Sequence, residues 1–214
     1  MTPPPPTEPP FLAGAVILAA GRSARMGRPK LLLPWGGTTV LGHLLAQWRR
    51  LGASQIGVVV GAQDRVLGSE LDRLGFPAQN RIINAAPERG MFSSIQCAGL
   101  WPGWSTHLTH WAIVLGDQPH LRHATLRGLL AFAARRPGQV CQPARDGRRR
   151  HPVLLPRRVF AELPGSKAAN LKDFLAGRET AVFESDDSGL DLDIDRPEDY
   201  QKALGLRVDR TGAR

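Results

Sequence analysis

Apolar runs of strand length alternate along this chain with stretches whose apolar residues recur every three or four positions. The runs predict buried strands over residues 15–20, 56–60, 82–83, 111–115, 139–142, 151–155, 181–184 and 190–194. The spaced pattern predicts amphipathic helices over residues 40–51, 65–74, 93–100, 121–135, 169–175 and 197–204. Strands that alternate with helices indicate an α/β protein whose mostly parallel sheet is covered on both faces.

Four polar or glycine-containing positions follow the predicted strands directly. They are Gly21, Gly61, Asn84 and Asp117. The carboxyl ends of parallel strands meet at one edge of a sheet, and ligands of open α/β sheets bind outside that edge. We therefore expect these four positions to lie together at the ligand-binding edge.

The loop after the first predicted strand has the composition of a phosphate-binding loop. It contains Gly21, Ser23, Arg25 and Lys30. Glycine lets backbone N–H groups approach an anion closely, and Arg and Lys supply positive charge. Because Leu31 rather than Ser or Thr follows Lys30, the loop is not a Walker A motif, and it is not G-x-G-x-x-G either. A basic surface turn is the alternative.

Three aspartates are candidates for binding a metal ion. Asp117 follows a buried strand directly, and Asp193 and Asp195 lie beside another predicted strand end. Mg²⁺ at a nucleoside triphosphate is commonly held by one or two carboxylates together with phosphate oxygens. The alternatives are a turn or helix-capping role for Asp117, and capping of the following helix by Asp195.

Composition narrows the class of protein only in part. The 214 residues carry a net charge of +9, which suits an anionic ligand, nucleic acid or a membrane surface without choosing among them. The length predicts one domain, residues 13–205, between a disordered Pro-rich tail (1–12) and a frayed tail (206–214). Apolar runs are too short for a membrane span, no signal peptide is recognisable, and the two cysteines lack zinc spacing. We expect a reduced, cytoplasmic protein.

The stretch LAAGRSARMGRPKLLLP, residues 18–34, resembles the signature loop of the MobA-like nucleotidyltransferases, and most of all their molybdenum cofactor cytidylyltransferase branch. Four more segments resemble motifs of this family and occur in the family's order: residues 84–94, 116–119, 149–153 and 193–200. The similarity covers roughly residues 14–204. It implies a three-layer α/β/α, Rossmann-like, mostly parallel sheet of the nucleotide-diphospho-sugar transferase type.

The resemblance also implies a reaction. A cytoplasmic, Mg²⁺-dependent enzyme would move CMP from CTP to molybdopterin in its molybdenum-loaded form and release pyrophosphate. The sequence Ala-Ala-Gly, rather than Leu-Ala-Gly-Gly, in the first loop favours CTP over GTP. The expected partners are CTP and a molybdopterin-type small molecule, with a molybdoenzyme or its chaperone as a further candidate. No nucleic acid or membrane partner is expected.

Residue roles carry over from the family by position. Arg25, Lys30 and Asp117 would be catalytic, and Asp117 and Asp195 would hold Mg²⁺. The residues expected to bind the nucleotide are Leu18, Ala19, Ala20, Gly21, Ser23, Arg25, Lys30, Asn84, Ser94 and Asp117. The residues expected to bind the acceptor are Arg149, Arg150, His151 and Pro152.

Two positions depart from the family pattern. Arg150 stands where the family has the glycine of Arg-Gly-His-Pro-Val, and Arg196 stands where it has the threonine of Asp-Thr-Pro-Glu-Asp. Glycine at such a place indicates a positive φ or a close approach by substrate. With arginine, either the loop is rebuilt or the guanidinium has a compensating task, and we expect Arg150 near the acceptor rather than the nucleotide.

Three other functions stay open from sequence. One is a cytidylyltransferase or sugar-nucleotide pyrophosphorylase with another phosphorylated acceptor, or with GTP as donor; the ordered motifs around His151 and Asp195 argue against it. Another is a family member diverted to a different reaction on a heteroaromatic ring. The last, a non-catalytic nucleotide- or RNA-binding module, is supported only by the positive charge.

Overall fold

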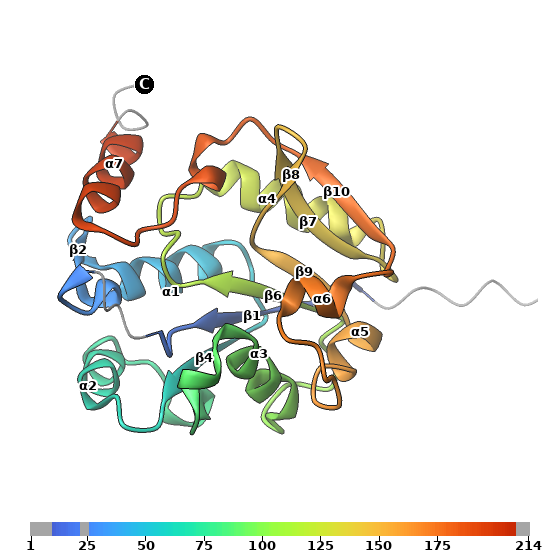
Figure 1. The fold of residues 1–214 in the computed structure, drawn as a ribbon, viewed down its shortest axis with the longest axis horizontal. Helices are drawn as coiled ribbons and strands as arrows, with labels where there is room; N and C mark the ends of the chain where they lie inside the picture. The colour runs from blue at the N-terminus through green and yellow to red at the C-terminus, as the bar shows by residue number, and fades with distance from the viewer. Residues whose placement is uncertain (1–9, 22–25, 209–214) are drawn as a thin grey trace, which may run out of the picture.

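The computed structural model describes residues 10–21 and 26–208, which form a mostly parallel sheet between two layers of helices (Figure 1). The main sheet contains β1 (Ala13–Leu18), β4 (Gln55–Gly61), β5 (Arg81–Asn84), β6 (His110–Leu115), β7 (Val140–Arg145), β8 (Arg148–Arg149), β9 (Val153–Pro156) and β10 (Thr180–Glu184). A separate two-stranded sheet pairs β2 (Pro34–Trp35) with β3 (Thr38–Thr39). The α-helices are α1 (Val40–Arg50), α2 (Arg65–Arg73), α3 (Met91–Leu100), α4 (His123–Ala134), α5 (Arg157–Ala161), α6 (Leu171–Leu175) and α7 (Pro197–Val208).

The strand order of the main sheet is β10-β7-β9-β6-β1-β4-β5, with β8 paired to β7. Strands β6, β1, β4 and β5 are mutually parallel, and β10 is parallel to β7. Strand β9 runs antiparallel to both β6 and β7, so these two neighbours point the same way. The carboxyl ends of six strands therefore meet at one edge, which confirms the predicted fold class.

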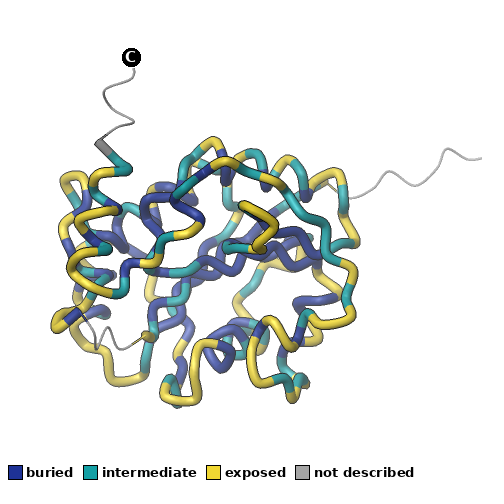
Figure 2. Tube along the Cα trace, turned by 45° about the horizontal axis from the view of Figure 1, so that its top comes forward, coloured by how far each residue is buried: buried dark blue, intermediate teal, exposed yellow. Residues whose placement is uncertain are grey.

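Alternate residues of the strands face opposite layers of helices. Ala15 and Ile17 of β1 belong to the core beneath α1, α2, α4 and α7, whereas Val16 belongs to the core beneath α3, α5 and α6. The same alternation holds in β6, where Ala112 and Ile113 face opposite ways. Buried strands thus run between helices whose outer surfaces are exposed (Figure 2). Burial on both faces explains why these strands read as continuous apolar runs.

Several predicted boundaries need correction. Strand β1 ends at Leu18, so Ala19 and Ala20 belong to the loop rather than to the strand. Helix α4 begins at His123 instead of residue 121. Helix α7 continues to Val208, beyond the predicted end of the folded domain, while residues 209–214 lie outside the described residues.

The predicted strand 190–194 is wrong. Residues Ser188–Asp191 form a 3-10 turn, η5, and the chain continues without sheet pairing through residue 195. The Asp187 side chain accepts a hydrogen bond from the Gly189 N–H at 3.0 Å, which favours a turn at this point. Leu190, Leu192 and Ile194 alternate with aspartates, which is the pattern of a half-buried strand and explains the wrong prediction.

Part of the expected N-terminal tail is ordered. The Leu12 N–H donates to Thr109 Oγ1 at 3.0 Å, and the Phe11 ring lies 4.8 Å from the His110 ring. Residues 11–12 therefore join the folded domain, whereas residues 1–9 lie outside the described part of the chain. Across the described ranges, no helix is both long and apolar enough to cross a membrane.

Candidate active site

A cavity of about 270 Å³ opens at the carboxyl ends of β1 and β6. Seven of the residues predicted to bind the nucleotide line it: Leu18, Ala19, Ala20, Gly21, Lys30, Ser94 and Asp117. Ser23 and Arg25 lie outside the described residues. The cavity also has walls that sequence reasoning missed, formed by Leu31, Pro87, Gly90, Met91, Leu115 and Gly116. We name it the smaller cavity.

Lys30 connects two carboxylates at this cavity. It begins the 3-10 turn η2 (Lys30–Leu32), and its Nζ donates to Asp117 Oδ2 at 2.6 Å. The same Nζ lies 3.5 Å from Asp195 Oδ1. The side chains of Lys30 and Asp117 are more than four-fifths buried, so their attraction is screened less than that of a surface pair. Three residues far apart in sequence thus form one charged cluster.

Asp117 has capacity left for a cation. Its Oδ1 is buried and accepts no hydrogen bond, although an anionic oxygen without a partner is costly to bury. Among the described residues, no group of three or more His, Cys, Asp or Glu side chains has metal-binding geometry. A metal ion here would need oxygen ligands from a bound substrate in addition to carboxylates, which is the usual arrangement for Mg²⁺ at phosphates.

The position of Asp117 depends on Gly116. Strands β1 and β6 pair in parallel, with Leu18 beside Leu115, so Gly116 passes close to the end of β1. A Cβ atom at Gly116 would lie only 2.7 Å from the Leu18 carbonyl oxygen and 2.9 Å from Leu31 Cδ2. Any other residue would push the strands apart at the floor of the cavity.

The segment that carries Asp193 and Asp195 is bound to the loop after β6. Gln118 Nε2 donates to Asp193 Oδ1 at 2.9 Å, and the Ile194 N–H donates to the Asp117 carbonyl at 3.1 Å. Burial, followed by the negative charge of Asp117, raises the pKa of Asp193. Of the two candidate carboxylates, Asp195 is therefore the one beside Lys30, while Asp193 is held by an amide.

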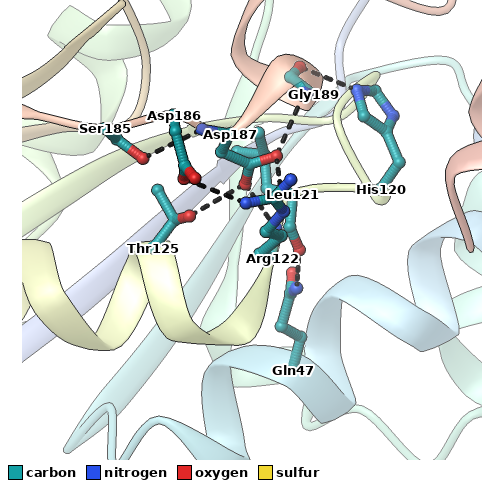
Figure 3. Close-up of polar contacts among 9 residues, drawn as sticks. All are labelled: Gln47, His120, Leu121, Arg122, Thr125, Ser185, Asp186, Asp187 and Gly189. Atoms are coloured by element: carbon teal, nitrogen blue, oxygen red, sulfur yellow. Dashed lines mark hydrogen bonds and ion pairs between the residues drawn. The ribbon is translucent and has the colours of Figure 1, made fainter. Parts of the chain in front are cut away.

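A buried aspartate anchors the start of the same segment (Figure 3). Asp187 is fully buried, and its carboxylate accepts hydrogen bonds from the Arg122 N–H at 2.8 Å and from Thr125 Oγ1 at 2.9 Å. His120 Nε2 lies 3.0 Å from the Gly189 carbonyl oxygen. These contacts join residues 187–189 to the start of α4. Sequence reasoning missed Asp187, although Asp-Asp-Ser-Gly is typical of a turn in which an aspartate caps the backbone.

Asn84 supports the cavity from behind rather than lining it. Its buried side chain donates from Nδ2 to Ser93 Oγ and Ser94 Oγ, each at 2.9 Å, and accepts from the Ala86 N–H at 2.9 Å. These bonds shape the loop between β5 and α3. Only Ser94 of this group reaches the cavity wall.

A larger cavity of about 830 Å³ lies next to the first, and Met91 lines both. Three of the residues predicted to bind the acceptor line it: Arg149, Arg150 and His151. Pro152 is buried and does not line it. Asn170, the N-cap of helix α6, Lys172 in the helix and Arg178 in the loop after it also line the cavity, and sequence reasoning did not single them out.

Arg150 adopts no strained backbone. Among the described residues, Asp146 is the only non-glycine residue with a positive φ, 50°, and Gly147 follows with 72°. The tight turn of the β7–β8 hairpin takes this conformation, so Arg150 carries no backbone strain of the kind that the family's glycine would relieve. The guanidinium instead donates to Asp191 Oδ1, from Nε at 2.9 Å and from Nη2 at 2.5 Å.

His151 adds no charge to the larger cavity at neutral pH. Burial lowers its pKa, which outweighs the opposite effects of the Ile113 carbonyl and of Asp117. A neutral imidazole neither attracts an anionic ligand by charge nor repels the nearby arginines. Cations on this side therefore come from the arginine and lysine side chains.

A mostly parallel sheet with a cavity and a charged cluster at its strand ends has the arrangement in which open α/β proteins bind their ligands. Residues 15–182 match the MobA-like NTP transferase domain, and the chain belongs to this family. The family is one of transferases, so the protein is an enzyme of that class.

Two relatives are named for the transfer of different nucleotides, cytidylyl in one and guanylyl in the other. The molybdenum cofactor cytidylyltransferase of Escherichia coli K12 is 27% identical over 188 residues, 86% of this chain and 92% of that protein. The molybdenum cofactor guanylyltransferase of Rhizobium johnstonii is 32% identical over 164 residues, 77% of this chain and 69% of that protein.

A solved structure has the same fold over nearly the whole chain. The crystal structure of Rv0371c from Mycobacterium tuberculosis H37Rv has a TM-score of 0.72 and 26% identity, and the match covers 92% of this chain and all of that one. The manganese complex of the same protein has a TM-score of 0.66 at 24% identity, covering 92% of this chain and 99% of that one.

Proposed function

We propose that this protein transfers CMP from CTP to the phosphate group of a molybdopterin-type acceptor and releases pyrophosphate. The observation that carries the proposal is the cluster at the smaller cavity, where Lys30 Nζ lies 2.6 Å from Asp117 and 3.5 Å from Asp195. The names of the cytidylyltransferase and guanylyltransferase relatives supply the chemical class of donor and acceptor.

The smaller cavity is suited to the triphosphate. Lys30 brings positive charge to it, and the chain leaves β1 through Ala19, Ala20 and Gly21, whose small side chains leave room for a ligand. Among the described residues, no atom would lie within 4 Å of a Cβ placed on Gly21. Neutralising the charge that moves between phosphate oxygens is the main catalytic requirement of such transfers.

Asp117 and Asp195 would hold Mg²⁺ in this proposal. The fit rests on Asp117 Oδ1, a buried oxygen that accepts no hydrogen bond, and on the oxygen-only chemistry of the two side chains. When bound, a divalent ion there withdraws charge from the phosphates of the nucleotide. Lys30 contacts both carboxylates, of which Asp117 lines the cavity, and the Ile194 N–H, which donates to the Asp117 carbonyl, holds the segment that carries Asp195 beside it.

The larger cavity is suited to the acceptor. A phosphate monoester has a second pKa of about 6 and is mostly dianionic near neutral pH, so it can attack without a general base. Arg149 and Lys172 line the cavity and would bind this dianion. Met91 lines both cavities, so an acceptor phosphate held there would approach the α-phosphorus of the nucleotide from the neighbouring space.

GTP is the second candidate donor. The relatives named for the two donors are similarly distant, at 27% and 32% identity. The Ala-Ala-Gly sequence of residues 19–21 favours CTP by its resemblance to the cytidylyltransferase branch.

Pyrophosphate release tests the proposal. The purified protein is incubated with Mg²⁺ and each of the four nucleoside triphosphates, with and without molybdopterin, and Asp117→Asn serves as the control. We expect release only when CTP and molybdopterin are both present. Release with GTP in preference to CTP would show that GTP, and not CTP, is the nucleotide donor. Nucleotide binding without release under any condition would contradict transferase activity toward molybdopterin and favour a binding module or another reaction.

A further inference from the structure

We propose that Asp191 is a positioning residue, which ties the wall of the larger cavity to the segment that carries Asp195. It would thereby set where the acceptor lies relative to the nucleotide, a role that rests on the proposed function. Asp191 lines neither cavity and lies outside the segments that resemble family motifs.

The contact itself is a carboxylate shared by two arginines. Arg150 donates to Asp191 Oδ1 from Nε at 2.9 Å and Nη2 at 2.5 Å, and Arg145 Nη1 contacts Oδ2. All three side chains are about 30% exposed, so solvent screens them only in part. Burial raises the pKa of Asp191, but the hydrogen bonds from Arg150 and Arg145 outweigh it and leave the pKa below its usual value. The carboxylate is therefore charged at neutral pH.

One side of this contact is the β7–β8 hairpin. Arg145 ends β7, and the Arg150 N–H donates to the Pro143 carbonyl at 2.7 Å. Ala144 pairs with Arg149 across the hairpin, so Arg149 has a fixed place between the two arginines that hold Asp191. Fixing Arg145 and Arg150 consequently fixes the Arg149 backbone at the wall of the larger cavity.

The other side leads directly to the carboxylates of the smaller cavity. Asp191 ends η5, whose start is anchored by the buried Asp187. Two residues further on, Asp193 accepts from Gln118, and Ile194 donates to the Asp117 carbonyl. Continuous contacts thus run from Arg149 through Asp191 to Asp195 and Lys30.

The geometry favours positioning over direct acceptor binding for Arg150. Its guanidinium is engaged by a carboxylate that would repel an acceptor phosphate at the same place. Within the described part of the chain, Arg149 and Lys172 line the cavity and form no ion pair with a carboxylate. These two side chains, rather than Arg150, are therefore available to the acceptor.

Steady-state kinetics of Asp191→Asn separate positioning from general stabilisation. Because the variant loses a charge-assisted contact to two arginines, we expect the acceptor KM to rise about tenfold and kcat to fall a few-fold, with a smaller rise in the CTP KM because the loosened segment also carries Asp195. Asp191→Glu should recover part of the loss. Asp72→Asn is the matched control, because Asp72 pairs with Arg81 at 2.6 Å far from both cavities. A CTP KM that rises as much as the acceptor KM would overturn the proposal.

Amide hydrogen exchange tests the same connection without turnover. In Asp191→Asn, we expect residues 144–150 and residues 192–196 to exchange faster together, whereas Asp72→Asn leaves both segments unchanged. Faster exchange in the hairpin alone, or in neither segment, would overturn the proposal. If the wild-type protein transfers no nucleotide to any acceptor, the proposed function fails, and concerted exchange still decides whether Asp191 joins the two segments.

Discussion

The two neighbouring cavities are built in different ways. The smaller one, about 270 Å³, lies where adjacent parallel strands end, and its charged lining residues, Lys30 and Asp117, lie in the segments that follow those strands. The larger one, about 830 Å³, is walled by a hairpin and the short helix α6, which come from separate parts of the sequence. The first is fixed by the sheet, whereas the second depends on contacts such as the one at Asp191.

Their electrostatics differ as well. In the smaller cavity, Lys30 is balanced by two carboxylates, which suits a triphosphate that arrives with a divalent cation. In the larger cavity, Arg149 and Lys172 have no carboxylate partner among the described residues, which suits an anion that arrives without a metal. The difference indicates that each cavity serves one substrate.

The largest expected effect comes from Asp117→Asn. The change keeps the shape of the side chain but removes the negative charge that pairs with Lys30 and would hold Mg²⁺, so the metal that would stabilise the phosphate charge in the transition state binds poorly. We expect kcat to fall by about 10²–10³-fold, the range typical of losing one electrostatic group. Asp195→Asn should act in the same direction. Turnover is measured by pyrophosphate release, and circular dichroism checks the fold.

Asp186→Asn provides the control for the loss of a surface carboxylate, because Asp186 is 92% exposed and pairs with Arg122. It should retain full activity. An Asp117→Asn enzyme with normal turnover would show that the smaller cavity is not the reaction centre. Inactivation by Asp193→Asn with an active Asp195→Asn would assign the metal-binding role to the other carboxylate.

Lys30→Ala should have the next largest effect. It removes the cation between two carboxylates and the charge that faces the triphosphate, so CTP binding weakens and transfer slows by roughly tenfold to a hundredfold. The acceptor KM should change little. Isothermal titration with CTP and Mg²⁺ measures the first effect, and a variant with unchanged CTP affinity and rate would show that the loop is a surface turn.

Arg149→Ala and Lys172→Ala probe the larger cavity. Each removes one cation from the wall, so we expect the acceptor KM to rise about tenfold while the CTP constant stays within about twofold. Initial rates at varied acceptor and fixed saturating CTP measure the difference. Lys202→Ala, on the exposed face of α7, is the matched control for losing one positive charge. A changed KM for CTP with an unchanged KM for the acceptor would show that the larger cavity binds the nucleotide and would contradict the assignment of the two cavities.

The smallest expected effect is on the stability of the whole domain, so it should not distinguish the two cavities. Burial lowers the pKa of His110 to about 4, whereas the ordinary value is 6.5. Between these values the unfolded chain binds a proton that the folded protein excludes, so stability falls as the pH falls from about 6.5 towards 4. Denaturant unfolding at several pH values measures this loss, which should be smaller in His110→Gln. An identical pH dependence in the variant would assign the loss to other groups.

The sequence predicted the smaller cavity better than the larger one, for a physical reason. Asp117 lies two residues after β6, and Lys30 lies in the loop that follows β1, so local pattern and strand topology together place them at one edge. Arg149 and Arg150 were predicted as a group, but their separate tasks depend on Asp191, 41 residues beyond Arg150. A pairing over that distance leaves no periodic signal in the chain.

The error at residues 190–194 has a similar origin. Alternation of leucine and isoleucine with aspartate is the pattern of a half-buried strand, and both Leu190 and Ile194 are indeed buried. The backbone of this segment pairs with the loop of residues 117–120 instead of with a strand, through bonds such as the one from Ile194 to Asp117. Apolar periodicity records which side chains are buried and does not record where backbone hydrogen bonds go.

The central claim is that the two cavities divide the substrates, and a crystal structure with a non-hydrolysable CTP analogue and Mn²⁺ tests it most directly. We expect the triphosphate beside Lys30 in the smaller cavity, with an anomalous signal for the metal at Asp117 and Asp195. The larger cavity, between Arg149 and Lys172, should hold no part of the nucleotide. Nucleotide phosphates bound against Arg149, with no metal at Asp117, would contradict the account.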